Sequence, residues 1–190
     1  MIDRDVQLSN GTITLRPYRA EDADSLYEAA VESRAELSPW MPWCHPDYRI
    51  EESRTFVEER PEKWEQGLAY DFAISDSASG LYLGGCGLSD IQRSKYDNGL
   101  ANLGYWVRTS RTKKGVATAA TRLLAGFAFD VLKLSRVEIV IAVENKASQR
   151  VAEKAGATRE GVLRNRLSIH GEPVDAVMFS LIPQDMERGV

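Results

Sequence analysis

The pattern of hydrophobic and polar positions predicts strands and helices in a mixed order. Residues 12–16 alternate between apolar and polar side chains, as in a half-buried strand, and the alternation stops at Pro17. Apolar residues between positions 116 and 132 recur every three or four residues, as on the buried face of a helix. By the same criteria, helices are expected over 21–33, 50–66 with an interruption or a change of phase near Pro61, and 145–155. Strands are expected over 70–74, 81–91, 100–107, 136–143, 158–169 and 173–182.

This order of elements predicts an α+β fold with a mixed sheet. Short turns join the strands between residues 70 and 107, so these strands should form an antiparallel meander. A parallel pair is needed only across the helix over 116–132, because a crossover of that kind joins parallel strands. No repeat, linker or low-complexity segment interrupts the chain, so residues 1–190 are expected to form one domain.

Composition narrows the classes of function. The 24 basic and 28 acidic residues leave a net charge of −4, which argues against a general nucleic-acid binder. No apolar run approaches the roughly 20 residues that cross a bilayer, and the first residues are too polar for a signal peptide, so a cytoplasmic protein is expected. Cys44 and Cys86 should be free thiols of undetermined reactivity, and no metal site is expected.

A basic segment separates the strand that ends at Val107 from the helix that begins at Val116. Free N–H groups and the positive dipole end of a helix start can bind a phosphate or pyrophosphate, and Gly115 would let the backbone approach it. The alternative is a solvated loop before an ordinary helix. The glycines at 84, 85 and 87 lie inside a strand, where they indicate a bulge or close packing and not a nucleotide fingerprint.

A second group of polar residues begins at Asn145, where a strand leads into a helix. Asn145 has a structural explanation as the residue that caps this helix, and Ser148 could close the same turn. Ligands collect beyond the carboxyl ends of parallel strands in α/β sheets, so both side chains should lie beside the basic segment.

These segments together resemble the GNAT superfamily of acyl-CoA-dependent N-acetyltransferases. The resemblance rests on Leu-Gly-Tyr-Trp-Val at 103–107, Lys-Gly-Val-Ala-Thr at 114–118, and residues 144–157, and it extends in the family's order over 12–182. Residues 15–17 and 38–43 look like the branch that acetylates ribosomal-protein N-termini. The resemblance implies a central, mostly antiparallel sheet with a splayed pair of parallel strands and about four helices on its faces.

The resemblance also implies acetyl-CoA as the acetyl donor, with CoA as the product. The family's pyrophosphate loop reads Gln/Arg-x-x-Gly-x-Gly/Ala; Gly115 and Ala117 match it, whereas Thr112 occupies the leading position, one residue after Arg111. Family members hold the pantetheine arm along the preceding strand. The implied cofactor-binding residues are Trp106, Val107, Arg108, Arg111, Thr112, Lys113, Lys114, Gly115, Val116, Ala117, Thr118, Asn145 and Ser148.

The candidate catalytic positions are Ser148 and Asn102. Many family members protonate the leaving thiolate with a tyrosine where this chain has Ala152, but the N-terminal-acetylating branch is similar to this chain in having a serine at Ser148. Helix capping is the alternative role for Ser148. Asn102 stands where many relatives have a glutamate base, and an amide cannot take a proton, so the base is left open between water, Glu160, Glu172 and Asp175.

The candidate acceptor-binding residues are Trp40, Trp43 and Tyr105, although the tryptophan segment could also be a surface loop packed on the core. Because no general base is evident in the sequence, an acceptor with an α-amino group, whose pKa is about 7.7–8.0, is favoured over a lysine amine, whose pKa is about 10.4. The leading hypothesis is acetylation of a protein N-terminus of the ribosomal-protein type. The alternatives are a small-molecule amine, such as a polyamine or an amino-sugar antibiotic, and a non-catalytic acyl-CoA-binding module. The resemblance adds a homodimer as a family expectation, with no nucleic-acid or membrane partner.

Overall fold

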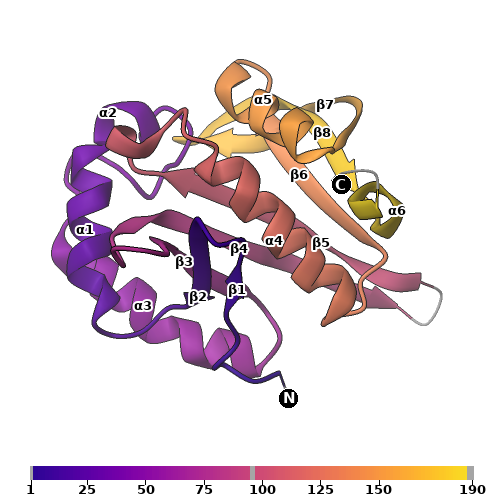
Figure 1. Cartoon of the computed structure of the whole chain (residues 1–190). Coiled ribbons are helices and arrows are strands. Elements are labelled where there is room, and N and C mark those ends of the chain that lie inside the picture. Colours follow the sequence, from indigo (N-terminus) through magenta and orange to yellow (C-terminus); the bar gives the residue numbers. More distant parts are fainter. Residues whose placement is uncertain (1, 95–96, 188–190) are drawn as a thin grey trace.

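The computed structural model describes residues 2–94 and 97–187, which form one eight-stranded mixed sheet with helices on both faces (Figure 1). The strands lie in the order β1-β2-β3-β4-β5-β6-β8-β7. Neighbours are antiparallel except β5 and β6, which are parallel because the chain crosses over through a helix between them. The strands are β1 (Leu8–Ser9), β2 (Ile13–Pro17), β3 (Tyr70–Asp76), β4 (Tyr82–Ser94), β5 (Asp97–Val107), β6 (Arg136–Ala142), β7 (Thr158–Ile169) and β8 (Glu172–Leu181).

Two helices pack against each face of the sheet. Figure 1 shows α1 and α3 on one side and α4 and α5 on the other. No helix in the described part of the chain is long and apolar enough to cross a bilayer. The helices are α1 (Asp22–Glu32), α2 (Arg34–Leu37), α3 (Ile50–Glu65), α4 (Val116–Asp130), α5 (Lys146–Ala155) and α6 (Pro183–Glu187), with a 3₁₀ turn, η1 (Thr109–Arg111), before α4.

The predicted order of elements and the mixed fold class are confirmed. The short elements β1, α2 and α6 were not predicted, because two to five residues are too few to show a period. The expected interruption near Pro61 is wrong, since α3 runs through it. Pro61 gives up one backbone hydrogen bond, but Val57 and Trp64 bury the helix face on either side and keep it in place.

The parallel pair separates after a short ladder. Leu100, Ala101 and Asn102 of β5 are in register with Arg136, Val137 and Glu138 of β6. Beyond these three pairs, β5 continues beside β4, and β6 continues beside β8 as far as Ala142. The two strands therefore diverge toward their carboxyl ends, which confirms the expected splay and leaves an opening in the sheet.

The two faces of the sheet are filled differently. The face toward α4 carries large apolar side chains in the main core, including Phe72, Leu103 and Phe127. The face toward α1 and α3 carries Gly85 and Gly87 of β4 and Gly104 of β5, whose registers place them near the middle of the sheet. Because glycine has no side chain, this second face is hollow at its centre.

Candidate active site

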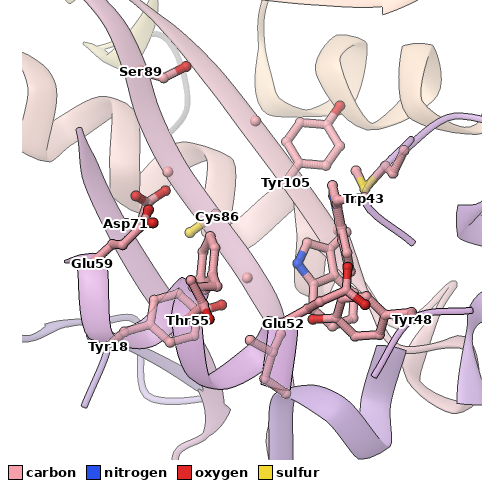
Figure 2. Close-up of a pocket in the computed structure, with 17 residues that line it drawn as sticks. Tyr18, Trp43, Tyr48, Glu52, Thr55, Glu59, Asp71, Cys86, Ser89 and Tyr105 are labelled. Carbon is pink, nitrogen blue, oxygen red and sulfur yellow. The ribbon is translucent and has the colours of Figure 1, made fainter. Parts of the chain in front are cut away.

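A cavity of about 650 Å³ lies over this glycine-rich floor, between the sheet, α1, α3 and the loop that precedes α3 (Figure 2). A side chain at position 85 would collide with the Tyr18 hydroxyl, and one at position 87 with the Asp71 carboxylate. A Cβ at Gly104 would have open space around it. Gly85 and Gly87 are therefore part of the floor of a binding site. Gly84 does not line the cavity, and it shows the predicted bulge and close packing, at a register shift and against the Trp106 backbone.

Aromatic side chains form one wall of the cavity. The ring centroid of Trp43 lies 5.5 Å from that of Trp106 and 5.6 Å from that of Tyr48. Figure 2 shows Trp43, Tyr48 and Tyr105 on the same side of the cavity. The structure thus brings two of the predicted acceptor residues, Trp43 and Tyr105, to the cavity, whereas Trp40 does not line it.

Three acidic side chains also line the cavity: Glu59 and Asp71 lie opposite the aromatic wall, and Glu52 lies on the side of Tyr48. The Glu52 pKa is lowered by the backbone N–H of Arg49, which donates to it over 2.9 Å, and the Glu59 pKa is lowered by Lys63 at 2.8 Å. Burial raises the Asp71 pKa, and Arg60 opposes this shift from 2.7 Å. Each of the three carboxylates thus has a basic partner: His45 for Glu52, Lys63 for Glu59 and Arg60 for Asp71.

Sequence reasoning missed these three acids. Glu52 and Glu59 are seven residues apart and so share one face of α3, which is an available signal, but a solvated helix face shows the same pattern. Asp71 occupies a polar position in an alternating strand, and nothing in its local sequence separates it from a surface residue.

The hydroxyls of Tyr105 and Ser148 meet across the opening between β5 and β6. Tyr105 Oη donates to the Ser148 carbonyl at 2.9 Å, and Ser148 Oγ donates to Tyr105 Oη at 3.1 Å. Burial raises the Tyr105 pKa to about 12, so this phenol stays protonated. Tyr105 also lines the cavity, so this residue connects the cavity with Ser148 on α5.

The start of α5 explains Asn145. Its Oδ1 accepts a hydrogen bond of 3.0 Å from the backbone N–H of Ser148, so Asn145 is the N-cap of this helix. The Ser148 hydroxyl takes no part in that cap and is free to bond Tyr105. Asn102 lies on β5 with its Oδ1 buried and without a hydrogen-bond partner among the described residues.

The start of α4 provides a backbone anion site. Gly115 precedes the helix with a φ of 79°, and the first intrahelical bond is from the Ala119 N–H to the Gly115 carbonyl. The N–H groups of residues 116–118 therefore have no partner within the helix. The Val116 side chain is buried in the core, while Lys113 and Lys114 are exposed beside the loop. This path fits a pyrophosphate held by backbone N–H groups.

Arg108 differs from its expected role. Its buried guanidinium pairs with Glu28 at 2.9 Å and with Glu32, both on α1, and it also donates to the Tyr82 carbonyl. Arg108 pairing holds the Glu32 pKa at about 2. The side chain thus joins the end of β5 to α1 instead of adding charge beside the basic loop, and only its backbone remains available there.

None of the three acids considered as bases from the sequence lines the cavity. Glu160 is paired with Arg136 at 2.5 Å, which lowers its pKa to about 2. Asp175 accepts the backbone N–H of Asn165 at 2.7 Å. Glu172 is an exposed residue at the start of β8.

The two cysteines are both buried. Cys44 donates a weak hydrogen bond of 3.6 Å to the Ala30 carbonyl. Cys86 touches the cavity, but burial raises the pKa of its thiol well above the ordinary value. A thiol in that state is a poor nucleophile, because the thiolate is the reactive form.

Comparison with known proteins agrees with this geometry. Residues 12–158 match the family model for the acetyltransferase (GNAT) domain. The chain is 30% identical over 185 residues to "Putative ribosomal N-acetyltransferase YdaF" of Bacillus subtilis (strain 168), covering 94% of this chain and 95% of that protein. It is also 30% identical over 182 residues to "Probable N-acetyltransferase YjcK" of the same organism, covering 95% and 99%.

Solved structures are similar over nearly the whole chain. A "putative ribosomal-protein-serine acetyltransferase" from Vibrio cholerae superposes with a TM-score of 0.80 at 28% identity, covering 96% of this chain and 100% of that one. The Microcin C7 self immunity acetyltransferase MccE, solved with acetyl-CoA and AMP, superposes with a TM-score of 0.83 at 25% identity, covering 91% and 93%. This chain therefore belongs to the GNAT family of acetyltransferases and is an acetyl-CoA-dependent N-acetyltransferase.

Proposed function

We propose that the protein acetylates the N-terminal amine of a protein, of the ribosomal-protein type. The observation that carries the proposal is the cavity, where aromatic side chains face carboxylates and Tyr105 leads to the opening in the sheet. Carboxylates draw in a protonated amine, and aromatic faces stabilise a cation and the apolar part of a peptide. The names of YdaF and of the Vibrio cholerae protein support a ribosomal protein as acceptor.

The chain's own residues fit the donor on the other side of the opening. Backbone N–H groups of residues 116–118 would hold the pyrophosphate, with Lys113 and Lys114 adding charge, and the edge of β5 after Asn102 would hold the pantetheine arm. When bound, acetyl-CoA supplies a thioester carbon open to attack and a thiolate leaving group. Backbone N–H groups of β5 that face the opening would stabilise the negative oxygen that develops during attack.

The hydroxyl pair of Tyr105 and Ser148 would supply the proton that the departing thiolate needs. Both protons lie at the opening, and the raised Tyr105 pKa keeps its proton available at neutral pH. Replacing Ser148 with Ala leaves its backbone N–H to bond Asn145, so the helix cap survives. We expect Ser148→Ala to lower kcat by about 10²-fold with little change in melting temperature. Loss of stability with kcat intact would assign the hydroxyl to structure.

The acceptor class is tested by measuring thiol release from acetyl-CoA with a panel of amines. The panel contains peptides with free Ala or Ser N-termini, the same peptides with a blocked terminus and an internal lysine, a polyamine and an amino-sugar antibiotic. We expect turnover with the free N-termini and none with the blocked peptides. Turnover with small amines alone would overturn the protein acceptor, and tight CoA binding without any turnover would indicate a non-catalytic binding module.

A further inference from the structure

We propose that Asp71 accepts the proton that the acceptor amine loses, which makes it the general base of this enzyme. The inference rests on the proposed function, because it assigns a role within that transfer. The bound ammonium loses one proton to the Asp71 carboxylate, and the neutral nitrogen then forms a bond to the acetyl carbon. Its second N–H proton replaces the one that the Tyr105–Ser148 pair gives to sulfur. The C–S bond breaks with its electron pair on sulfur, which takes a proton from the Tyr105–Ser148 pair.

The strand registers place Asp71 at the end of a row without intervening side chains. Asp71 of β3 is in register with Gly87 of β4, and Gly87 with Gly104 of β5. Neighbouring strands are about 4.8 Å apart, so the row from Asp71 to Gly104 spans about 10 Å. Both glycines expose only backbone, so an amine above them can reach the carboxylate directly or through one water molecule.

One oxygen of Asp71 points along this row. The side chain of Arg60 donates to Oδ2, whereas Oδ1 occupies the space that a side chain at Gly87 would fill. Figure 2 shows Asp71 beside Glu59, at the far end of the floor from Tyr105. The free oxygen is thus aimed over the floor of the acceptor cavity and not toward solvent.

Arg60 holds the carboxylate in this orientation. Its Nε donates to the Phe56 carbonyl at 3.0 Å, and its guanidinium carbon lies 4.1 Å above the Phe56 ring centre. Its second terminal nitrogen contacts Glu59 at 3.2 Å. A guanidinium fixed at three points cannot follow the carboxylate, so it selects one rotamer of Asp71.

The surroundings of Asp71 favour a role as a general base over a role as a permanently charged ion-pair partner. Burial disfavours its charge, and Glu59 beside it and the buried groups Tyr18 and Cys86 add no positive charge. Arg60 and Lys63 of α3 act in the opposite direction, and burial prevails. Glu52 and Glu59 instead have lowered pKa values, because N–H groups or lysine hold their charges. A carboxylate with a raised pKa is the better proton acceptor near neutrality.

The test compares pH profiles of kcat/KM for two acceptors of different amine pKa, such as two peptides with different N-terminal residues. For the unaltered enzyme we expect an acid-side inflection at the same pH with both acceptors, since it belongs to Asp71. For Asp71→Asn we expect kcat/KM to fall by about 10²-fold and the inflection to follow each acceptor's own pKa. CoA affinity should stay unchanged by calorimetry.

Two further variants distinguish a role of Asp71 as general base from a role as a charge that only attracts the amine. Glu59→Gln removes a charge from the same cavity, and we expect it to raise KM without moving the inflection. Asp71→Ala leaves room for a small carboxylate, so added formate should restore turnover in proportion to its concentration. A structural role for Asp71 would give no such rescue.

The inference is overturned if the unaltered enzyme has an inflection that follows the acceptor's pKa, an outcome that requires no variant to fold. It is also overturned if Asp71→Asn retains the original profile and rate. Either outcome leaves turnover of peptide N-termini intact, so the proposed function would stand. If only small amines are turned over, the same profiles and formate rescue test Asp71 with those acceptors.

Discussion

The donor side and the acceptor side of the reaction centre are formed by different kinds of groups. The donor side is mostly backbone: the N-terminus of α4 after Gly115 and the edge of β5 beyond Asn102. The acceptor side is mostly side chains, which come from the Trp43 loop, from α3 and from β3. A backbone site depends on the path of the chain, whereas a side-chain site depends on residue identity at scattered positions. The acceptor can therefore change by substitution while the fold and the donor site persist.

The largest effect that distinguishes the two sides should follow Gly115→Val. The position has a φ of 79°, which a β-branched residue adopts only with strain, and the new side chain would stand before the free N–H groups. We expect CoA affinity to fall by about 100-fold in a calorimetric titration. Lys113→Ala is the control and should cost far less, because this exposed charge is screened. Unaltered affinity in Gly115→Val would remove this loop from the donor site.

Gly104→Val tests the acceptor side in the same way. A Cβ there meets no atom within 4 Å, so the side chain should enter the cavity without disturbing the fold. We expect the KM for a peptide acceptor to rise about tenfold in steady-state assays, with CoA affinity by calorimetry unchanged. An equal loss of CoA affinity would show that the two sides are not separable at β5.

Asn145→Ala should affect stability more than chemistry. Loss of the cap at the start of α5 is expected to lower the free energy of unfolding by about 0.5–2 kcal/mol, measured by denaturant titration. Activity should change only through the KM for acetyl-CoA. A fall in kcat at unchanged stability would instead give Asn145 a direct part in transfer.

The smallest expected effect concerns Arg108, which joins the end of β5 to α1. Arg108 holds the Glu32 pKa at about 2, below its ordinary 4.5, so the pair contributes stability above pH 4.5 and loses it as the pH falls toward 2. We expect Glu32→Gln to lower the melting temperature slightly at pH 6, with a difference from the unaltered protein that vanishes near pH 2. A constant difference across this range would mean that the ion pair is not its source.

The difference between the donor side and the acceptor side also determines how much of the site could be predicted from the sequence. Periodicity identified α4 and the order of the longer elements along the chain, because each element has an apolar face that must be buried. The donor loop is contiguous, so Gly115 and its neighbours could be recognised as one motif. The acceptor cavity joins Trp43, Glu59 and Asp71, which lie far apart along the chain and look like surface residues one at a time. Only the tertiary structure shows that they line one cavity.

The ion-pair partners of Arg108 could not be predicted from the sequence for a related reason. A basic residue beside a basic loop is expected to extend it, but the side chain turns to α1, about 76 residues away in sequence. A proline inside a helix removes a backbone hydrogen bond, yet Pro61 did not break α3. Tertiary packing at Val57 and Trp64 outweighed the local preference there.

The short ladder between β5 and β6 also gives the sheet a mechanical property. Five strands lie on one side of this ladder and three on the other, and three residue pairs connect them. Such a junction can act as a hinge, about which a small rotation changes the width of the opening. The hydrogen bonds between Tyr105 and Ser148 cross the opening away from this hinge and limit how far it can widen. The hydroxyls proposed to serve the leaving group therefore also tie β5 to α5 across the opening.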